Sequence, residues 1–364
     1  MRPLIQALRV EARDHAGLLV FFAVYMLAAN IVMMAVKGEF IGFPFNLQSA
    51  SFYLVTRVTV YLGFIATVMA LWGAVRDWLL PATPLYDSAF QAAWAPLQPT
   101  LSQPLRTALR IVAFICIFAI LMSTFVQIKG IIPLVVPFYW DETFWAWDKA
   151  LHGGIDPWRI TWGLFDSDQA AHIIDRLYVS WFLIIHVVPV SVIAFDPDRT
   201  RRRQYLMSFF TLWAVLGNIA AIAFSSAGPC YTLNMAEFSN TLAVVYAPLM
   251  EGLAVAHANS PLDALQLQSL LWESYVDTDA MNIGISAMPS LHVAQAVLAA
   301  CLAFRYHRVL GLIACAYAAV IQLGSVHLAW HYAIDGYVAA AATVMIWMLV
   351  GKILTNRNRE IETA

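Results

Sequence analysis

Long apolar segments recur along this chain, and they constrain its fold more than any other feature of the sequence. A helix needs about 20 residues to cross the roughly 30 Å hydrocarbon layer of a bilayer. Only helices and closed barrels satisfy their backbone hydrogen bonds in lipid. Of the 364 residues, 61% are hydrophobic and only 12% are charged. Eight segments are long enough to span, at residues 16–36, 52–74, 108–128, 175–195, 205–225, 289–305, 309–328 and 332–354. We therefore predict an all-α, polytopic transmembrane helix bundle.

The basic residues divide unevenly between the two ends of these segments. With a cytoplasmic N-terminus, 15 of the 21 lysines and arginines fall at inner ends and 6 at outer ends, as the positive-inside rule requires. The loop FDPDRTRRRQ contributes most to this asymmetry. The first apolar run has no small-residue cleavage site, so we expect it to be retained as a span. We predict two cytoplasmic termini in a bacterial inner membrane, with outer loops at 129–174 and 226–288.

Ionisable residues gather at the predicted outer ends of the last three segments. The stretch ISAMPSLH brings His292 to the outer start of one segment. The stretch GSVHLAWHYAIDGY, between the last two segments, carries His327, His331 and Asp335 at intervals of four residues. That spacing places all three on one face if the stretch is helical. Ionisable residues at membrane depth usually mark a functional site.

This set of side chains suits phosphoryl transfer. A carboxylate four residues from a histidine can accept one ring N–H and leave the other nitrogen as a nucleophile. A second histidine can protonate the leaving group. Pro289 suits the first position of a helix, where free backbone N–H groups and the Ser290 hydroxyl form an anion pocket. The sequence therefore predicts chemistry through a phosphohistidine on an anionic lipid headgroup.

The same residues carry a family resemblance. PSLH, followed about forty residues later by HYAID, resembles the second and third signatures of the type 2 phosphatidic acid phosphatase superfamily. The nearer match is the branch of inositol phosphorylceramide and sphingomyelin synthases, with P-S-x-H and H-Y-x-x-D. The resemblance implies that His331 is the nucleophile, Asp335 its orienting partner and His292 the general acid and later base. Ser290 would bind phosphate. The resemblance covers residues 108–354, so we expect a six-helix catalytic core in 108–364 and two additional spans in 1–107.

Two departures from the superfamily pattern concern the phosphate clamp. The first signature, K-x6-R-P, should follow the fifth segment, but that place reads SSAGPCYTLNM and holds no basic residue. The arginine of the third signature falls at Ser325. These departures favour headgroup transfer over plain phosphatidate hydrolysis. They also require other phosphate or substrate contacts, for which the outer face offers Lys129, Arg176, Arg159, His327 and Tyr231.

The sequence leaves two alternatives for the acceptor of the phosphoryl group: water, or the hydroxyl of a second lipid such as ceramide or diacylglycerol. The resemblance implies no cofactor and no nucleic-acid partner. Two other functions are compatible with the residues: a metal-dependent hydrolase with His327, His331 and Asp335 as ligands, and a non-catalytic transporter. Each histidine alone could also be a packing residue.

The two outer loops are expected to contain amphipathic helices that roof the site and select a headgroup. One of these helices lies in 137–165, and the other follows Ser260 as its N-cap.

Overall fold

The structure, a computed structural model, describes residues 16–41, 104–235, 240–277 and 283–363. Within these ranges the regular elements are all helices, and seven helical segments are long and apolar enough to cross a membrane. The predicted all-α polytopic bundle is thus confirmed. The predicted span at 52–74 and most of the N-terminal unit 1–107 lie outside the described residues.

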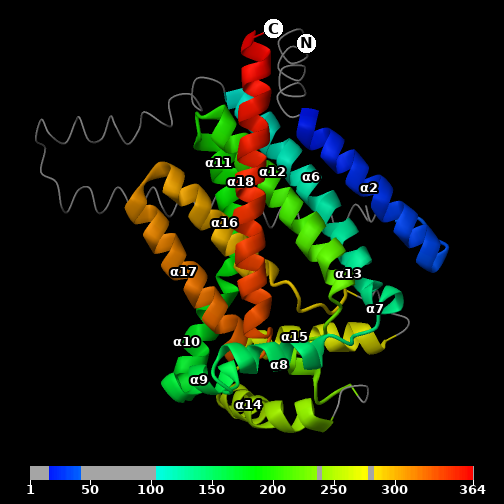
Figure 1. Ribbon diagram of the computed structural model, residues 1–364, viewed down its shortest axis with the longest axis vertical. Helices are drawn as coiled ribbons and strands as arrows, with labels where there is room; N and C mark the ends of the chain where they lie inside the picture. The colour runs from blue at the N-terminus through cyan, green and yellow to red at the C-terminus, as the bar shows by residue number, and fades with distance from the viewer. Residues whose placement is uncertain (1–15, 42–103, 236–239, 278–282, 364) are drawn as a thin grey trace, which may run out of the picture.

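Six of the seven candidate spans run along the bundle in Figure 1. Their helices are α2 (Ala16–Lys37), α6 (Pro104–Gly130), α10 (Asp168–Val179) with α11 (Trp181–Phe195), α12 (Arg199–Ala214) with η2 (Val215–Ala220) and α13 (Ala221–Ala223), α17 (Arg308–His327) and α18 (Ala333–Thr363). The shorter helix α16 (Leu291–Tyr306) packs against α17 and α18. It corresponds to the predicted span at 289–305.

The seventh candidate span, α14 (Asn240–Asn259), was not predicted. It meets the length and composition of a span, but Figure 1 shows it lying across the end of the bundle. Further helices lie at the same end: α7 (Ile132–Val135), α8 (Asp141–Leu151), α9 (Pro157–Leu164), the short η3 (Pro229–Tyr231) and α15 (Asp263–Val276). We call α8, α9, α14 and α15 the end cap. The described parts of the two loops that were predicted to lie on the outer side thus fold into helices that cover one end of the bundle.

Side chains fix several helix boundaries that hydropathy alone misplaces. The fifth predicted segment begins at Arg199 instead of residue 205, because the Asp198 carboxylate accepts hydrogen bonds from the backbone N–H groups of Thr200 (2.9 Å) and Arg201 (3.0 Å). Such N-caps stabilise a helix start by about 1 kcal/mol. The expectation that Ser260 caps α15 was wrong. The N-cap residue of α15 is Leu262. The Asp175 carboxylate of α10 accepts hydrogen bonds from the first backbone N–H groups of α15, those of Asp263 and Ala264.

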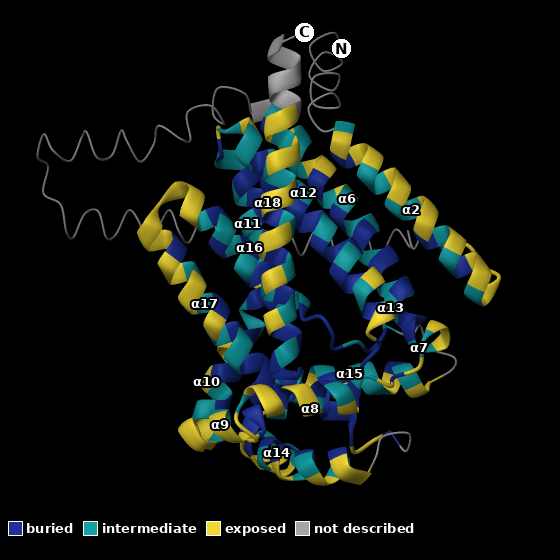
Figure 2. Ribbon diagram, viewed as in Figure 1, coloured by how far each residue is buried: buried dark blue, intermediate teal, exposed yellow. Residues whose placement is uncertain are grey.

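Aromatic side chains fill the middle of the bundle. Phe118 lies at a ring-centroid distance of 5.7 Å from Phe209, and Phe125 at 4.9 Å from Trp213. Figure 2 shows buried residues concentrated there, whereas exposed residues follow α2 and the outer side of α17. The exposed side chains on α2 include Val20 and Leu27, as expected for a helix that faces lipid.

Candidate active site

Two histidines from different segments lie close together at the capped end of the bundle. His292 lies in the first turn of α16, and His331 lies in the turn before α18. Their ring centroids are 6.0 Å apart and their planes make an angle of 63°. Both line one cavity of about 320 Å³. A phosphorus atom in this cavity would therefore lie within reach of both rings.

Asp335 holds one side of the His331 ring. Its fully buried Oδ2 lies 3.3 Å from His331 Nδ1 and also accepts the backbone N–H of Tyr332 at 3.1 Å. The backbone of Ala287 makes a further hydrogen bond to the His331 ring. Burial lowers the pKa of His331 well below its usual range, which favours the neutral imidazole that a nucleophile requires.

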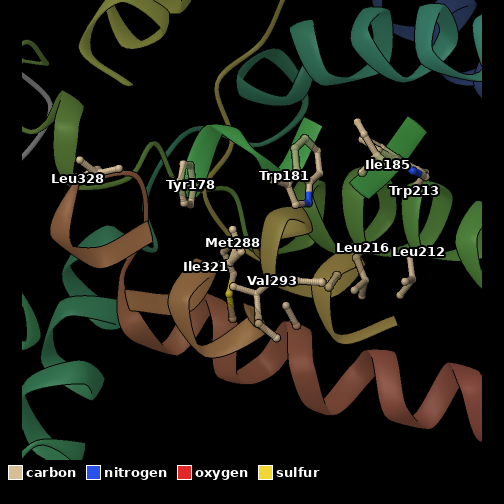
Figure 3. Close-up of a cluster of buried hydrophobic side chains, with 14 of the residues drawn as sticks. Tyr178, Trp181, Ile185, Leu212, Trp213, Leu216, Met288, Val293, Ile321 and Leu328 are labelled. Atoms are coloured by element: carbon tan, nitrogen blue, oxygen red, sulfur yellow. The ribbon is translucent and has the colours of Figure 1, made fainter. Parts of the chain in front are cut away.

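Two aromatic rings enclose His292. The centroid of its ring lies 4.7 Å from that of Tyr178 and 4.1 Å from that of Trp181. Figure 3 shows both aromatic side chains in the buried cluster around the start of α16. Stacking of this kind restricts the imidazole to one orientation. The two rings therefore fix the position of the His292 side chain beside the cavity.

Lys129, at the C-terminal end of α6, supplies the positive charge of the cavity. It is the one lysine or arginine among the described residues that line the cavity. Its charge acts on both His292 and His331. An anionic substrate placed between the histidines would therefore meet one cation from the protein wall.

The remaining predicted substrate contacts lie in different surroundings. Tyr231 lines the cavity, but its hydroxyl donates to the backbone oxygen of Gln268 at 3.2 Å. Arg176 is 73% exposed and lies 3.5 Å from the Asp263 carboxylate, outside the cavity lining. Arg159 is paired with Asp156 at 3.2 Å. Of the three basic candidates, only Lys129 borders the cavity.

Ser290 is the N-cap of α16, so the helix begins at Leu291 and Pro289 precedes it. The expectation that Pro289 occupies the first helical position was wrong. The Ser290 hydroxyl accepts the backbone N–H of Val293 at 3.5 Å, and the Ser290 N–H donates to the Asp335 carbonyl at 3.2 Å. Ser290 therefore joins the start of α16, which carries His292, to the first turn of α18, which carries Asp335. Its fully buried side chain is not part of the cavity lining.

The expectation that His327, His331 and Asp335 share one helical face was also wrong. Helix α17 ends at His327, and the chain turns back before α18 starts at Ala333. In this turn the backbone N–H groups of Trp330 and His331 both donate to the carbonyl of Ser325. The fully buried His327 stacks on Trp162 at 5.0 Å. Among the described residues, no group of three histidines, cysteines or acids could hold a metal ion.

Two buried acids of α8 were missed by the sequence analysis. The Asp141 carboxylate accepts from Ser226 Oγ (2.9 Å), the N–H groups of Ala227 (3.1 Å) and Gly228 (2.9 Å), and the Tyr332 hydroxyl (3.1 Å). Burial raises its pKa, and these donors oppose that shift. The signal was available, because acids seven residues apart lie on one face of a helix.

Asp148 contacts the other side of the turn that carries His331. Its Oδ2 accepts from the backbone N–H of Ala333 at 2.6 Å, and its Oδ1 from that of Ile334 at 2.7 Å. Together the two acids connect α8 to the turn that carries His331.

Backbone hydrogen bonds join three connections beneath the end cap: the one after α13, the one before α16 and the turn between α17 and α18. Ala287 N–H donates to the Ser226 carbonyl, and Cys230 N–H donates to the Ala329 carbonyl, both at 2.9 Å. Gly228 permits this approach. Its φ of +94° is in the glycine-favoured region, and a Cβ atom there would lie 2.8 Å from the Trp330 carbonyl oxygen.

From the histidines the cavity extends between apolar side chains of α6, α11 and η2. Its lining there comprises Phe118, Met122, Phe125, Phe182, Ile185 and Gly217. At Gly217 a Cβ atom would lie 2.6 Å from the Phe125 ring and 2.8 Å from Leu291. The absence of a side chain at this position therefore keeps the apolar part of the cavity open.

A family model described as the PAP2 superfamily matches residues 142–349. This range contains both histidines and Asp335, whereas Lys129 and Asp141 precede it. Comparisons with curated proteins and with solved structures give no match.

Proposed function

Since the chain belongs to the PAP2 superfamily, we propose that it is a membrane enzyme that transfers a phosphate-bearing headgroup from one lipid to another through a covalent intermediate on His331. The observation that carries the proposal is the facing pair His292 and His331, which border an apolar cavity with one lysine. Membership of the family itself points to lipid phosphatase or phosphotransferase chemistry in a membrane.

In the first half-reaction, His331 attacks the phosphorus atom of the donor lipid. Asp335 engages Nδ1, so Nε2 is the attacking nitrogen. The P–N bond forms as the bond from phosphorus to the lipid oxygen breaks. The leaving alkoxide takes the proton of the His292 imidazolium.

In the second half-reaction, the now neutral His292 removes a proton from the acceptor hydroxyl. The acceptor oxygen bonds to phosphorus as the P–N bond breaks. This step returns His331 to its neutral form and His292 to its protonated form, so the cycle closes without any other reactant.

The charge of the cavity favours transfer over simple phosphatidate hydrolysis. A phosphate monoester carries about −1.5 to −2 at pH 7, whereas a phosphodiester carries a single negative charge. Lys129 is the one lysine or arginine of the lining among the residues that the structure describes. The proton of His292 passes to the leaving group, so one permanent cation faces the phosphate; it balances a diester donor and leaves a monoester undercompensated in a buried site.

We place the site at the outer face of the membrane. The basic cluster at the start of α12, which includes Arg201 and Arg202, lies at the opposite end of the bundle from the end cap. The positive-inside rule assigns that basic end to the cytoplasm. The catalytic histidines then face the periplasm in a bacterial inner membrane.

The test of the function is a lipid panel with purified protein in detergent. The donors are phosphatidylinositol, phosphatidylglycerol and phosphatidate, each with and without ceramide or diacylglycerol, and mass spectrometry follows the products. A new headgroup-bearing lipid that forms only with the acceptor supports transfer. Free phosphate from phosphatidate alone would identify a phosphatase instead. No turnover of any donor would contradict the proposal.

Replacement of Lys129 with alanine should lower kcat/KM for the diester donor about 10- to 100-fold, because a charged hydrogen bond in a buried site is worth roughly 1.5–3 kcal/mol. Lys129→Arg should retain part of the activity. The exposed Lys352 in α18 provides the control, as Lys352→Ala should match the wild type. An unchanged kcat/KM in Lys129→Ala would show that the lysine does not compensate the phosphate.

The apolar part of the cavity is the site we assign to a lipid tail. Gly217→Ala should push Phe125 and Leu291 into this space, since the new Cβ would lie within 3 Å of both. We expect kcat/KM to fall about 10-fold for donors with long acyl chains, equivalent to about 1.4 kcal/mol. Donors with eight-carbon chains should keep near-normal turnover.

The matched control for Gly217→Ala is Gly163→Ala in α9, where a Cβ would meet nothing within 4 Å. A loss that is equal for long and short chains would show that Gly217 supports the fold and not the choice of tail.

A further inference from the structure

Helix α18 begins two residues after the proposed nucleophile His331, and a side chain from another helix accepts its first backbone N–H groups. The residue before Ala333 is Tyr332, whose hydroxyl points to Asp141. A helix start leaves its first backbone N–H groups without partners inside the helix. For Ala333 and Ile334 the partner is Asp148, at 2.6 and 2.7 Å, from a helix far away in the chain.

The same helical turn holds the catalytic carboxylate. Asp335 is the third residue of α18, and its Oδ2 reaches back to the backbone N–H of Tyr332 at 3.1 Å and to His331 Nδ1 at 3.3 Å. In a capping box, the side chain of the third helical residue accepts the N–H of the N-cap residue, as Asp335 does here. The N-cap side chain, usually serine or threonine, accepts an N–H of the first turn; here Asp148 accepts the first-turn N–H groups instead. The orientation of Asp335, and through it that of His331, therefore depends on the contact with Asp148.

Helix α8 is well suited to hold this contact. Asp141, Phe144 and Asp148 form its buried face, and the two acids are two turns apart. Asp141 ties the other end of α8 to the 226–228 segment and to the Tyr332 hydroxyl. Because α8 is held at two of its residues, its position is better defined than by one contact. Asp141 and Asp148 both also contact the turn that carries His331.

We propose that α8 is the positioning element of the catalytic turn, acting through the carboxylates of Asp148 and Asp141. The inference rests on the proposed function, because it takes His331 as the nucleophile. Neither acid is part of the cavity lining, so both act through Asp335 and His331 and not on the lipid. Burial raises the pKa of Asp148 to about 7, and the hydrogen bonds from Ala333 and Ile334 oppose that effect.

The decisive variant is Asp148→Asn, which keeps the size of the side chain and one acceptor oxygen. A displacement of the nucleophile by about 1 Å can cost roughly 100-fold in rate. We expect kcat with the best donor of the lipid panel to fall about 10- to 100-fold while KM stays within about 3-fold. Asp148→Ala, which removes both acceptors, should lower kcat further.

Asp175 offers a matched control within the chain. Its carboxylate is equally buried and accepts two first-turn backbone N–H groups of α15, from Asp263 at 2.8 Å and Ala264 at 2.9 Å. Asp175→Asn should therefore lower the melting temperature by a similar amount. Its kcat should stay within about 3-fold of the wild type, because α15 carries none of the three catalytic side chains.

The outcomes separate failure of this inference from failure of the proposed function. If His331→Ala retains activity, the proposed function is wrong. If His331→Ala is inactive but Asp148→Asn and Asp175→Asn lose kcat equally, the acid of α8 only supports the fold and our inference is overturned.

If Asp148→Asn does not fold, Tyr332→Phe decides the question. This change removes only the hydroxyl that binds Asp141 and preserves the ring packing. A fall in kcat of about 3- to 10-fold with unchanged KM supports the positioning role of α8. An unchanged kcat overturns it.

Discussion

His331→Ala should abolish turnover of every donor lipid, with a loss of about 10⁴-fold or more, as expected when the group that forms the covalent intermediate is removed. The reason is specific to the proposed chemistry: without Nε2 no P–N bond can form. The measurement is turnover together with labelling of the protein by a donor that carries radioactive phosphorus. The wild type should retain a label that is labile in acid and stable in base, as expected for a phosphohistidine.

His307→Ala serves as the control for this experiment. His307 caps α17 at the opposite end of the bundle, where its Nδ1 accepts the backbone N–H of Val309 at 3.2 Å. This variant should keep both turnover and label. A wild-type level of activity in His331→Ala would end the phosphohistidine mechanism, whatever the behaviour of the other residues.

His292→Ala should lose about 10²- to 10⁴-fold in kcat with natural lipid donors, which is the usual contribution of a general acid or base. The loss should depend on the leaving group. A p-nitrophenyl ester of the same phosphate has a leaving group that needs no proton, so the first half-reaction should survive. The second half-reaction should still stall, since nothing removes the proton from the acceptor.

The expected signature is a burst of about one p-nitrophenolate per active site, followed by slow turnover. Stopped-flow absorbance would measure it, with His331→Ala as the variant that shows no burst. An equal loss in the rate of the first half-reaction, measured as the burst phase for the p-nitrophenyl ester and as single turnover for the lipid donor, would contradict the role of His292 as an acid. The stacked position of the ring between Tyr178 and Trp181 would then be structural.

The sequence predicts the helical class and the placement of PSLH and HYAID on the same side of the membrane, because both follow from local rules. Hydropathy identifies the spans. Successive spans cross in opposite directions, which puts PSLH and HYAID on one side. The proximity of His331 and Asp335 follows from a separation of four residues, although the helix starts between them. The structure brings His292 to the same cavity, while the catalytic roles remain predictions.

The errors concern contacts between distant parts of the chain. His327 has the same four-residue spacing, but the end of α17 intervenes and turns its side chain toward Trp162. Ser260 has the composition of an N-cap, yet a carboxylate from α10 takes that role at α15. A local pattern specifies that a helix needs a cap. Which residue provides it depends on the tertiary packing.

The backbone hydrogen bonds that join the three connections beneath the end cap also bear on the order in which the chain is made. His292 enters the membrane on α16, but its partner His331 follows α17, and Asp335 belongs to α18. In the proposed mechanism, a chain whose synthesis has not passed α17 therefore has the acid His292 but lacks the nucleophile His331 and its partner Asp335. The bond from Ser290 to Asp335 then closes the site as α18 docks. The proposed chemistry would thus begin only after α18 has docked.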